Sequence, residues 1–400
     1  VITLGSRLED GVKVSNVGGV VGFCKGSVEN CSNSREIDAS TEGSNVGGVV
    51  GIVECNTGTK LTGNSNAGEI SSRGDFTGGL FGRVYASEPS ERGTYAIELV
   101  GMNNSGSVNG SKNVGGIAGT IEGYYKYKQY DGTYSLRINL SNCFNIGKVM
   151  SSGDYAGGVV GYGNNTDSFK DCSNGGDVIG VNWVGGVVGR TDAMVYANDF
   201  SNKNSITGYA YVGGIAGECG GISDASNYGN VVTIGSRIED GVKVSNVGGV
   251  VGLCRGSIEN CSNLKEIKST SGGSNVGGVA GSLECNTSSK VNRNSNTGNV
   301  SSNGENTGGV FGMVYTREPS ERGTYEVALV EANNKGNVNG VKNVGGIAGI
   351  IEGYYKYKQY DGTYSLEISV FNCSNTGGIV AHNENQGSIV GLLGNQAEIL

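Results

Sequence analysis

The fold of this chain is decided by the stretch NVGGVVGFCKGSVENCSN at residues 16–33. The stretch returns almost unchanged as NVGGVVGLCRGSIENCSN at residues 246–263, and looser versions of it fill the sequence between these two copies. Self-similarity of this kind is the signature of repeat proteins, in which each repeat packs against its neighbours. The spacing of the repeat therefore limits the architectures that are possible.

The repeat has two periods. The short period is marked by the phrase GG-x-x-G, which recurs every 28 to 42 residues. The long period is 230 residues, and residues 1–170 align without gaps with residues 231–400. We expect one continuous solenoid over residues 1–400, with a first block of seven coils at 1–230 and a second, truncated block at 231–400. The short phrase begins at Gly18, Gly47, Gly78, Gly115, Gly157, Gly185, Gly213, Gly248, Gly277, Gly308 and Gly345, with a degenerate copy at Gly387.

The composition favours strands. Glycine occupies 74 positions and proline only 2, while valine, isoleucine, asparagine and serine are abundant. This mixture disfavours helices and favours short strands joined by tight turns. A unit of about 28 residues cannot bury an apolar face alone, but stacked copies can. We therefore expect an all-β fold, a parallel β-solenoid (β-helix) of about twelve coils of 28–42 residues, with about three short strands in each coil and with β-hairpin insertions.

Two kinds of residue in the glycine phrase have a structural explanation. The glycines, such as Gly18, Gly19 and Gly22, are expected at tight corners that need a positive φ or a close backbone approach. The valines and isoleucines between them are expected to point inward, where each packs on its equivalent in the next coil. Val187 is one such position.

A second phrase, N-C-S-N or a variant of it, lies between successive glycine phrases, and Asn33 ends its first copy. Stacking places each asparagine beside its equivalent, so that its amide can bond to the next coil, and asparagine also tolerates the left-handed conformation. The unit that begins at Gly185 carries a looser version around Asn204. The other copies end at Asn66, Asn104, Asn145, Asn174, Asn227, Asn263, Asn296, Asn334 and Asn375.

The chain has ten cysteines, and five of them share one slot, two residues before the asparagine of the second phrase. Other units place alanine, methionine or asparagine in this slot, which favours an inward position and buried free thiols. Disulfides, for example between Cys24 and Cys31, are the alternative. Zinc is not expected, because no C-x-x-C pair exists. The five slot residues are Cys31, Cys143, Cys172, Cys261 and Cys373.

The most distinctive insertion is EGYYKYKQYDGTYSL at residues 122–136, which recurs without change at 352–366. An Asp-Gly pair between two alternating runs predicts a hairpin with a type I′ turn. Its tyrosine rings either cover the flank of the solenoid, mediate lateral self-association or bind a ligand. The candidate contact residues are Tyr124, Tyr125, Tyr127, Tyr130 and Tyr134, with their counterparts Tyr354, Tyr355, Tyr357, Tyr360 and Tyr364.

Two other insertions also recur after 230 residues. SEPSERGTY at 87–95 returns as REPSERGTY at 317–325 and contains both prolines of the chain. SRLEDGVKV at 6–14 returns as SRIEDGVKV at 236–244 and again carries an Asp-Gly pair.

The glycine phrases resemble a known family of repeats. Gly79-Leu80-Phe81-Gly82 matches the GLUG motif literally, and Gly19-Val20-Val21-Gly22 is a looser variant of it. The resemblance covers essentially the whole chain, although this chain prefers valine or isoleucine to leucine. GLUG repeats occur in large secreted or surface-anchored microbial proteins, including adhesin-like proteins and non-catalytic regions of immunoglobulin A-cleaving metallopeptidases. The only histidine is His382, so the H-E-x-x-H signature is absent, and the resemblance implies a scaffold rather than a protease.

Several function classes find no support in the sequence. The formal net charge is −8 and the basic residues form no runs, which argues against a nucleic-acid partner. No apolar stretch approaches the roughly 18 residues of a membrane helix. No P-loop, nucleophile elbow or dinucleotide fingerprint is present, and we expect no catalytic residues, no cofactor and no metal. Carboxylates such as Glu88, Glu91 and Asp131, with Arg92, are the weak exception, because a polysaccharide-active β-helix enzyme would need such a cluster.

We therefore expect an extracellular or cell-surface structural repeat protein, a segment of a longer secreted protein that acts as a stalk, filament or adhesin spacer. Its expected partners are other copies of itself, by end-to-end or lateral association, or host and matrix glycans and proteins. A glycan- or protein-binding surface module is the first alternative, and a polysaccharide-active β-helix enzyme is the second.

Overall fold

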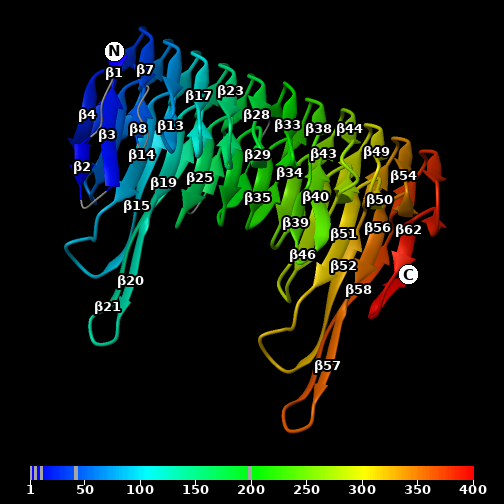
Figure 1. Ribbon diagram of the computed structural model, residues 1–400. Helices are drawn as coiled ribbons and strands as arrows, with labels where there is room; N and C mark the ends of the chain where they lie inside the picture. Colours follow the sequence, from blue (N-terminus) through cyan, green and yellow to red (C-terminus); the bar gives the residue numbers. More distant parts are fainter. Residues whose placement is uncertain (1, 4–6, 10–11, 40–43, 167, 197–200) are drawn as a thin grey trace. The chain divides into compact units, whose positions relative to one another are not determined.

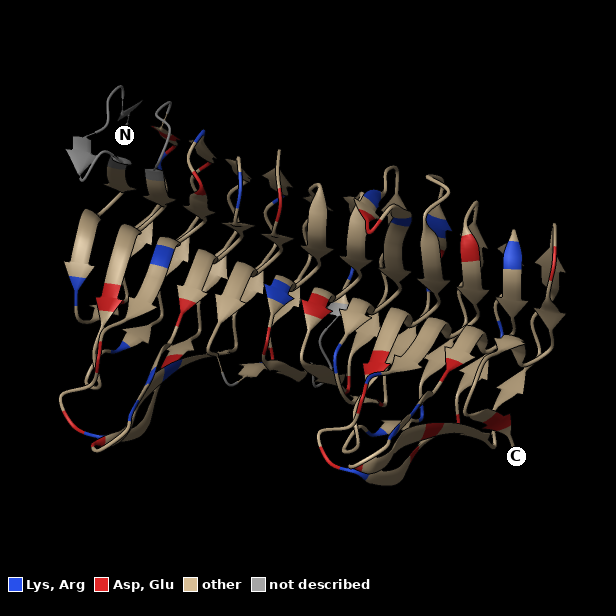
Figure 2. Cartoon of the chain, turned by 60° about the horizontal axis from the view of Figure 1, so that its bottom comes forward, with Lys and Arg blue, Asp and Glu red and all other residues tan. Residues whose placement is uncertain are grey.

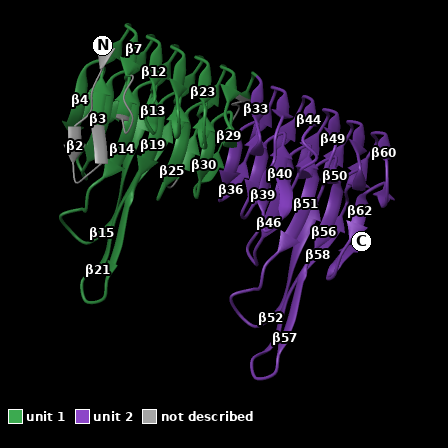
Figure 3. Cartoon of the chain, viewed as in Figure 1, with its two compact units in different colours: residues 1–204 green, residues 205–400 purple. Residues whose placement is uncertain are grey.

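The structure, a computed structural model, describes residues 2–3, 7–9, 12–39, 44–166, 168–196 and 201–400. The chain divides into two compact units, residues 1–204 and residues 205–400 (Figure 3). Both units have the same architecture, and the described residues contain strands but no helix. Accordingly, they contain no helix that is long and apolar enough to cross a membrane. The sequence blocks at 1–230 and 231–400 stay a prediction.

The coil of the first unit that begins with β8 (Ser44–Gly47) shows the repeating element. The next coil begins with β13 (Phe76–Gly78), which pairs in parallel with β8 so that Gly78 lies beside Gly47. A coil therefore has five short strands rather than the three expected, because some strands are only two residues long and end at single turn residues. The five strands are β8 (Ser44–Gly47), β9 (Val50–Cys55), β10 (Leu61–Thr62), β11 (Ser65–Asn66) and β12 (Ile70–Ser72).

Equivalent strands of successive coils pair in parallel and form five sheets in each unit (Figure 1). The expected all-β parallel β-solenoid with hairpin insertions is confirmed. A coil of the second unit consists of β45 (Ser274–Gly277), β46 (Ala280–Cys285), β47 (Val291–Asn292), β48 (Ser295–Asn296) and β49 (Val300–Ser302).

The core of each coil contains the apolar residues of the glycine phrase. Val49 and Val50 are fully buried, their counterparts are buried in the following coils as far as Ile347 and Ala348, and Val187 is buried as expected. Val20 in the first coil is exposed, because that coil has a neighbour on one side only within the described residues. Burial of two consecutive residues is possible because each pair lies at a corner between two strands.

The glycines of the phrase serve close packing rather than a special φ. A Cβ atom on Gly18 would lie 2.0 Å from the carbonyl oxygen of Val21, and one on Gly19 would lie 2.3 Å from that of Gly48. A Cβ atom on Gly22 would lie 2.5 Å from the carbonyl oxygen of Asn16. None of the three has a positive φ. The close-approach explanation therefore holds for these glycines.

The asparagines of the second phrase form a hydrogen-bonded ladder, as expected. In the first unit, Nδ2 of Asn33 donates to Oδ1 of Asn66 at 2.8 Å, and Asn66 donates to Asn104 at 2.8 Å. The ladder continues through Asn145, Asn174 and Asn202 at 2.7, 2.8 and 3.1 Å. Asn202, rather than Asn204, is thus the ladder residue of its coil. The ladder strands are β6 (Ser32–Asn33), β11, β16 (Asn103–Asn104), β22 (Phe144–Asn145), β27 (Ser173–Asn174) and β32 (Ser201–Asn202).

The second unit has the same ladder. Asn227, Asn263, Asn296, Asn334 and Asn375 are linked by amide bonds of 2.9, 2.8, 2.8 and 2.7 Å. The left-handed conformation is not found at the ladder asparagines but three residues earlier, for example at Asn260 and Asn372. Within the second phrase, amide bonding and the left-handed conformation, both expected of one asparagine, are therefore divided between two positions.

A further asparagine ladder lies before the glycine phrases of the second unit. Nδ2 of Asn275 donates to Oδ1 of Asn246 at 2.9 Å, and Asn306 donates to Asn275 at 2.8 Å. These three residues have positive φ angles of 45° to 66°. In the same column of the first unit, Tyr155 and Trp183 stack with ring centroids 5.0 Å apart. This column thus combines a left-handed backbone with stacking of identical or similar side chains.

In the insertion at 236–244, β39 (Arg237–Glu239) and β40 (Val242–Gly248) form a β-hairpin with a two-residue turn. Asp240 and Gly241 have φ angles of 48° and 81°, as a type I′ turn requires. The Asp-Gly pair of the first copy, Asp10 and Gly11, lies outside the described residues.

Candidate functional site

Each unit carries one arm, a three-stranded ribbon that extends beyond the stack of coils (Figure 1). In the first unit it consists of β15 (Gly93–Val100), β21 (Gly132–Ser141) and β20 (Tyr124–Lys128). β15 pairs in parallel with β21, and β20 pairs with β21 in the antiparallel direction. The corresponding strands of the second unit are β52 (Gly323–Val330), β58 (Gly362–Phe371) and β57 (Tyr354–Lys358). The arm thus joins two insertions that are separate in the sequence.

The turn at the tip of the arm differs from the predicted type I′ turn. Lys128 pairs with Gly132, which leaves a loop of three residues, and the amide of Asp131 donates to the carbonyl oxygen of Lys128 at 3.2 Å. Gly132 has a φ of 88°, but Asp131 has no positive φ. This is a type I turn followed by a left-handed glycine. A two-residue loop at Asp131-Gly132 would move the odd-numbered tyrosines to the opposite face of the ribbon.

The observed register divides the five tyrosines between the two faces of the arm. Tyr125 and Tyr127 project from one face with 57% and 63% of their surface exposed, and Tyr130 at the tip is 92% exposed. Tyr124 and Tyr134 lie on the opposite face and are half-buried. Three of the predicted contact residues therefore present their rings to solvent, while the other two are packed.

The two packed tyrosines belong to a polar clamp centred on Glu88. The hydroxyl of Tyr124 donates to the Glu88 carboxylate at 2.6 Å, and the Lys128 ammonium donates to it at 2.6 Å. The Lys128 ammonium also lies 4.3 Å from the centre of the Tyr134 ring, a cation–π contact. Figure 2 shows the basic and acidic residues of the arms close together in both units. The clamp ties β20 to the loop before β15.

The clamp shifts the pKa of each of its members. Hydrogen bonds from Lys128 and then Tyr124 lower the pKa of the Glu88 carboxyl. The same contacts with Glu88 raise the pKa of Lys128 and of Tyr124. Two donors thus hold Glu88 as a carboxylate. Glu88 is one of the carboxylates that the sequence offered for a polysaccharide-active enzyme, and here it is already hydrogen-bonded within the arm. Among the described residues, no group of three or more His, Cys, Asp and Glu side chains could hold a metal ion.

The arm of the second unit repeats this arrangement. Tyr354 donates to Glu318 at 2.8 Å, Lys358 forms an ion pair with the same carboxylate, and Lys358 lies 4.3 Å from the centre of the Tyr364 ring. The exposed tyrosines here are Tyr355, Tyr357 and Tyr360, with the same exposed fractions as in the first unit. The sequence showed that the insertions recur, but their contact through Glu88 and Glu318 was missed. The one sequence signal for this contact is that the insertion at 87–95 and the insertion at 122–136 recur together, at 317–325 and 352–366.

The cysteine slot faces the core. Cys143, Cys172 and Cys261 are buried, and Cys31 and Cys373, which occupy the same slot, are half-buried. All ten cysteines carry free thiols in the structure. Cys219 and Cys254 are Cα partners on adjacent parallel strands, β35 (Ala216–Cys219) and β41 (Val251–Cys254). These two equivalent cysteines thus lie side by side along the stacking direction.

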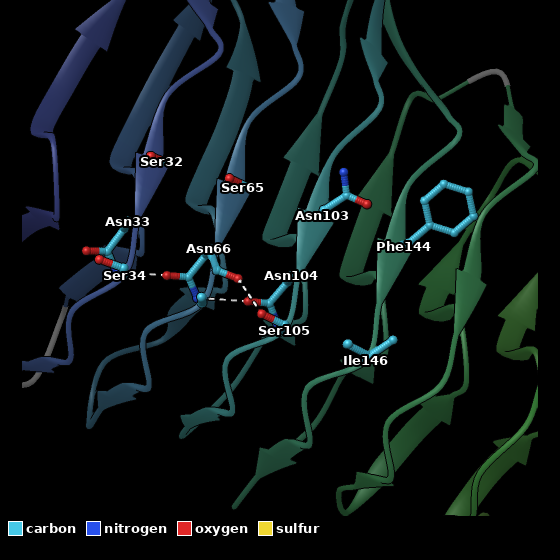
Figure 4. Close-up of a pocket in the computed structure, with 11 residues that line it drawn as sticks. Ser32, Asn33, Ser34, Ser65, Asn66, Asn103, Asn104, Ser105, Phe144 and Ile146 are labelled. Atoms are coloured by element: carbon cyan, nitrogen blue, oxygen red, sulfur yellow. Dashed lines mark hydrogen bonds between the residues drawn. The ribbon is translucent and has the colours of Figure 1, made fainter.

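A pocket of about 420 Å³ lies on the outer surface of the first unit, over the ladder sheet (Figure 4). No pattern in the sequence predicted this pocket. Phe144 and Ile146 lie at one end of it, and serines, asparagines and Ala67 line the remainder. The lining residues are Ser32, Asn33, Ser34, Ser65, Asn66, Ala67, Asn103, Asn104, Ser105, Phe144 and Ile146.

Comparison with known proteins finds no matching family model, no matching curated protein and no matching solved structure. The class of this protein is therefore given by its fold, a parallel β-solenoid with projecting arms.

Proposed function

We propose that this chain is an extracellular structural repeat protein, a stalk, filament segment or adhesin spacer that presents its arms for contact. The observation that supports this most directly is the occurrence of the same clamped arm, with the same three exposed tyrosines, on each unit. A side chain held on an ordered ribbon loses little further conformational freedom when it binds a partner. Repetition of the arm would also add avidity to weak single contacts.

The solenoid is suited to the role of a spacer. Its coils are joined by parallel sheets and by continuous ladders of buried amides, so each coil is braced by its neighbours. The resemblance of the glycine phrases to GLUG repeats of large secreted and surface proteins supports an extracellular location. We include adhesion among the proposed roles for the same reason.

A surface-binding module is the second candidate function, and the exposed rings of Tyr125, Tyr127 and Tyr130 favour it. Tyrosine offers a flat apolar ring and a polar hydroxyl, and it is enriched in binding surfaces for this reason. The proposed partners are a second copy of this chain or glycans and proteins of a host or matrix.

One experiment tests both candidates. The exposed arm tyrosines, Tyr125, Tyr127, Tyr130, Tyr355, Tyr357 and Tyr360, are changed to serine, and cell adherence, binding to matrix proteins and glycans, and filament bundling are compared with the parent chain. We expect unchanged folding and the loss of at least one of the three interactions. The matched control is Tyr196→Ser with Tyr228→Ser, two exposed tyrosines outside the arms. If all three interactions persist, the arms are not contact elements.

A further inference from the structure

We propose that the pocket over the ladder sheet of the first unit binds an unbranched, neutral polysaccharide that lies across the coils. This binding site goes beyond the structural function proposed above, and it includes no residue of the arms. The proposal is based on the chemistry of the pocket wall, its lack of charge and its aromatic end.

Three successive coils place a polar side chain at the same position of the pocket wall. Ser32, Ser65 and Asn103 are Cα partners on consecutive parallel strands, so their side chains recur at about 4.8 Å along the pocket. The hydroxyls of Ser32 and Ser65 have no hydrogen-bond partner among the described residues, and the Asn103 amide donates only to the carbonyl oxygen of Gly101. A ligand with hydroxyl groups at a regular, similar spacing would match this row, as a linear chain of sugar units does.

The pocket carries no charge. None of its eleven lining residues is Asp, Glu, Lys, Arg or His. A ligand with carboxylate or sulfate groups would lose hydration there without gaining an ionic partner, which is costly. The floor is formed by ladder residues such as Asn66 and Asn104, whose amides already bond to each other. A neutral polysaccharide is therefore favoured over an acidic one.

The apolar end of the pocket supplies the contact that a sugar ring prefers. Ile146 is 67% exposed, and Figure 4 shows it on the same side of the pocket as the ring of Phe144. The C–H groups on one face of a pyranose pack well on an aromatic ring, while its hydroxyls remain free for the polar row. Phe144 would hold a sugar unit, and the serines and Asn103 would bind the units that follow.

An extended peptide fits this pocket less well. Peptides usually bind to a sheet by pairing their backbone with a free strand edge. Here the backbone amides of Ser65, Asn103 and Phe144 already donate to carbonyl oxygens of the preceding coil at 2.8 to 3.0 Å. A bound peptide would thus have to satisfy its own backbone with side chains alone.

The second unit provides an internal control. The residues 230 positions after Phe144 and Ile146 are Ser374 and Thr376, so the apolar end is missing there. Leu264 and Lys335 replace Ser34 and Ser105 in the equivalent coils. The pocket chemistry is therefore specific to the first unit, although the polar row Ser262, Ser295 and Asn333 is retained.

The test is isothermal titration calorimetry of the full chain with cellohexaose, xylohexaose and chitohexaose. The double variant Phe144→Ser with Ile146→Thr introduces the residues that the second unit already tolerates, so its fold should be retained. We expect the parent to bind at least one of these neutral probes with a stoichiometry of one. The double variant should bind that probe about tenfold more weakly or worse, a change of about 1.4 kcal/mol.

Three controls make the outcome decisive. The arm variant Tyr125→Ser, Tyr127→Ser and Tyr130→Ser should bind the probe as the parent does, which separates this site from the arms. The variant Ser374→Phe, Thr376→Ile, Leu264→Ser and Lys335→Ser should raise the stoichiometry to two. The acidic probe hexagalacturonate should bind more weakly than the neutral probes.

The proposal is overturned if the parent binds none of the neutral probes at millimolar concentration, or if the double variant binds them as tightly as the parent. Tighter binding of hexagalacturonate would also refute it. Binding of a neutral Gly-Ser-Asn peptide in place of every sugar probe would assign the pocket to peptides instead. These results would leave the proposed role of the arms untouched, because the arm tyrosines are tested separately.

Discussion

The carboxylate of Glu88 and the ammonium of Lys128 meet at 2.6 Å, although forty residues separate them in the chain. Their contact joins the loop before β15 to the hairpin strand β20, so that two insertions become one arm. It also fixes which face of β20 is packed and leaves Tyr125 and Tyr127 on the exposed face. The identical pair in the second unit, Glu318 and Lys358, has the same consequence.

Removing this clamp should loosen the arm without unfolding the solenoid. We expect Glu88→Gln with Glu318→Gln to increase the hydrogen-exchange rate of the β20 and β57 amides, because a neutral amide forms no ion pair with the lysine ammonium and accepts only weaker hydrogen bonds. The melting temperature should not change, since the clamp lies outside the coils. The matched control is Glu91→Gln with Glu321→Gln, exposed residues of the same loops. Equal exchange in both variants would show that the arm does not depend on the clamp.

The clamp should also be pH-dependent. Because Lys128 and Tyr124 lower the pKa of Glu88, the clamp is complete above the ordinary glutamate pKa and is lost as the pH falls through the lowered value. Because Glu88 raises the pKa of Lys128, the clamp persists below the ordinary lysine pKa and is lost as the pH rises through the raised value. We expect slow exchange of the β20 amides, corrected for intrinsic rates, between these limits and faster exchange in acid. Exchange protection that does not change in acid would contradict this assignment.

The asparagine ladder should contribute to stability through groups that cannot reach water. Asn104 donates to Oδ1 of Asn145 and to the carbonyl oxygen of Gly106, both at 2.7 Å. Asn104→Ala would leave both acceptors short of a donor, at a cost of about 1–3 kcal/mol for each buried group. We expect a clearly lower urea midpoint than for Asn109→Ala, an exposed asparagine of β17 (Val108–Gly110). Equal midpoints would mean that the ladder adds no stability.

The sequence predicted the stacking of coils because stacking follows from periodicity alone. If each coil repeats its neighbour, equivalent residues must lie side by side, and the Asn66–Asn104 bond follows from that. The inward position of Val187 and of the cysteine slot follows from periodicity together with the mainly apolar residues that each position carries from coil to coil. These inferences needed no knowledge of contacts between unlike parts of the chain.

The features that the sequence did not predict depend on such contacts. An Asp-Gly pair forms a type I′ turn at Asp240-Gly241, whereas Asp131 is the last residue of a type I turn and Gly132 is the left-handed residue after it. The pair itself is compatible with both, and the register of the arm agrees with the contacts that Glu88 makes. The pocket was missed for a similar reason, because its shape comes from residues of four different coils.

The thiols should fall into two classes by their rate of reaction, a fast half-buried class and a slow buried class. Burial raises the pKa of Cys55 and of Cys261 to about 12, so these thiols are protonated and shielded at neutral pH. We expect the half-buried Cys24, Cys31 and Cys373 to react first with an aromatic disulfide reagent, and all ten thiols to react after denaturation without reductant. Fewer than ten thiols in the denatured, unreduced chain would show that disulfides form. Similar rates for all ten in the folded chain would contradict the burial of the slot.

The packing of the core is tested most directly by a charge at Val187. This residue is buried between the strands β29 (Asn182–Gly185) and β30 (Val188–Thr191), where its carbonyl oxygen accepts from the amide of Val159 at 2.8 Å. Val187→Asp would place a carboxylate there without a partner, and uncompensated buried charges cost about 3–5 kcal/mol. We expect a large fall in the urea midpoint at pH 7.

The same variant should recover part of its stability in acid. Burial disfavours the ionised form and raises the pKa of a carboxyl group, so the new side chain should be neutral in the folded state once the pH falls below that raised value. The penalty should therefore be smaller at pH 5 than at pH 7, relative to the parent at each pH. The control is Met150→Asp on the outer face of β23 (Val149–Ser151), for which we expect a change within about 0.5 kcal/mol at both values. If Val187→Asp unfolds at the same urea concentration as Met150→Asp, the assignment of this position to the core is wrong.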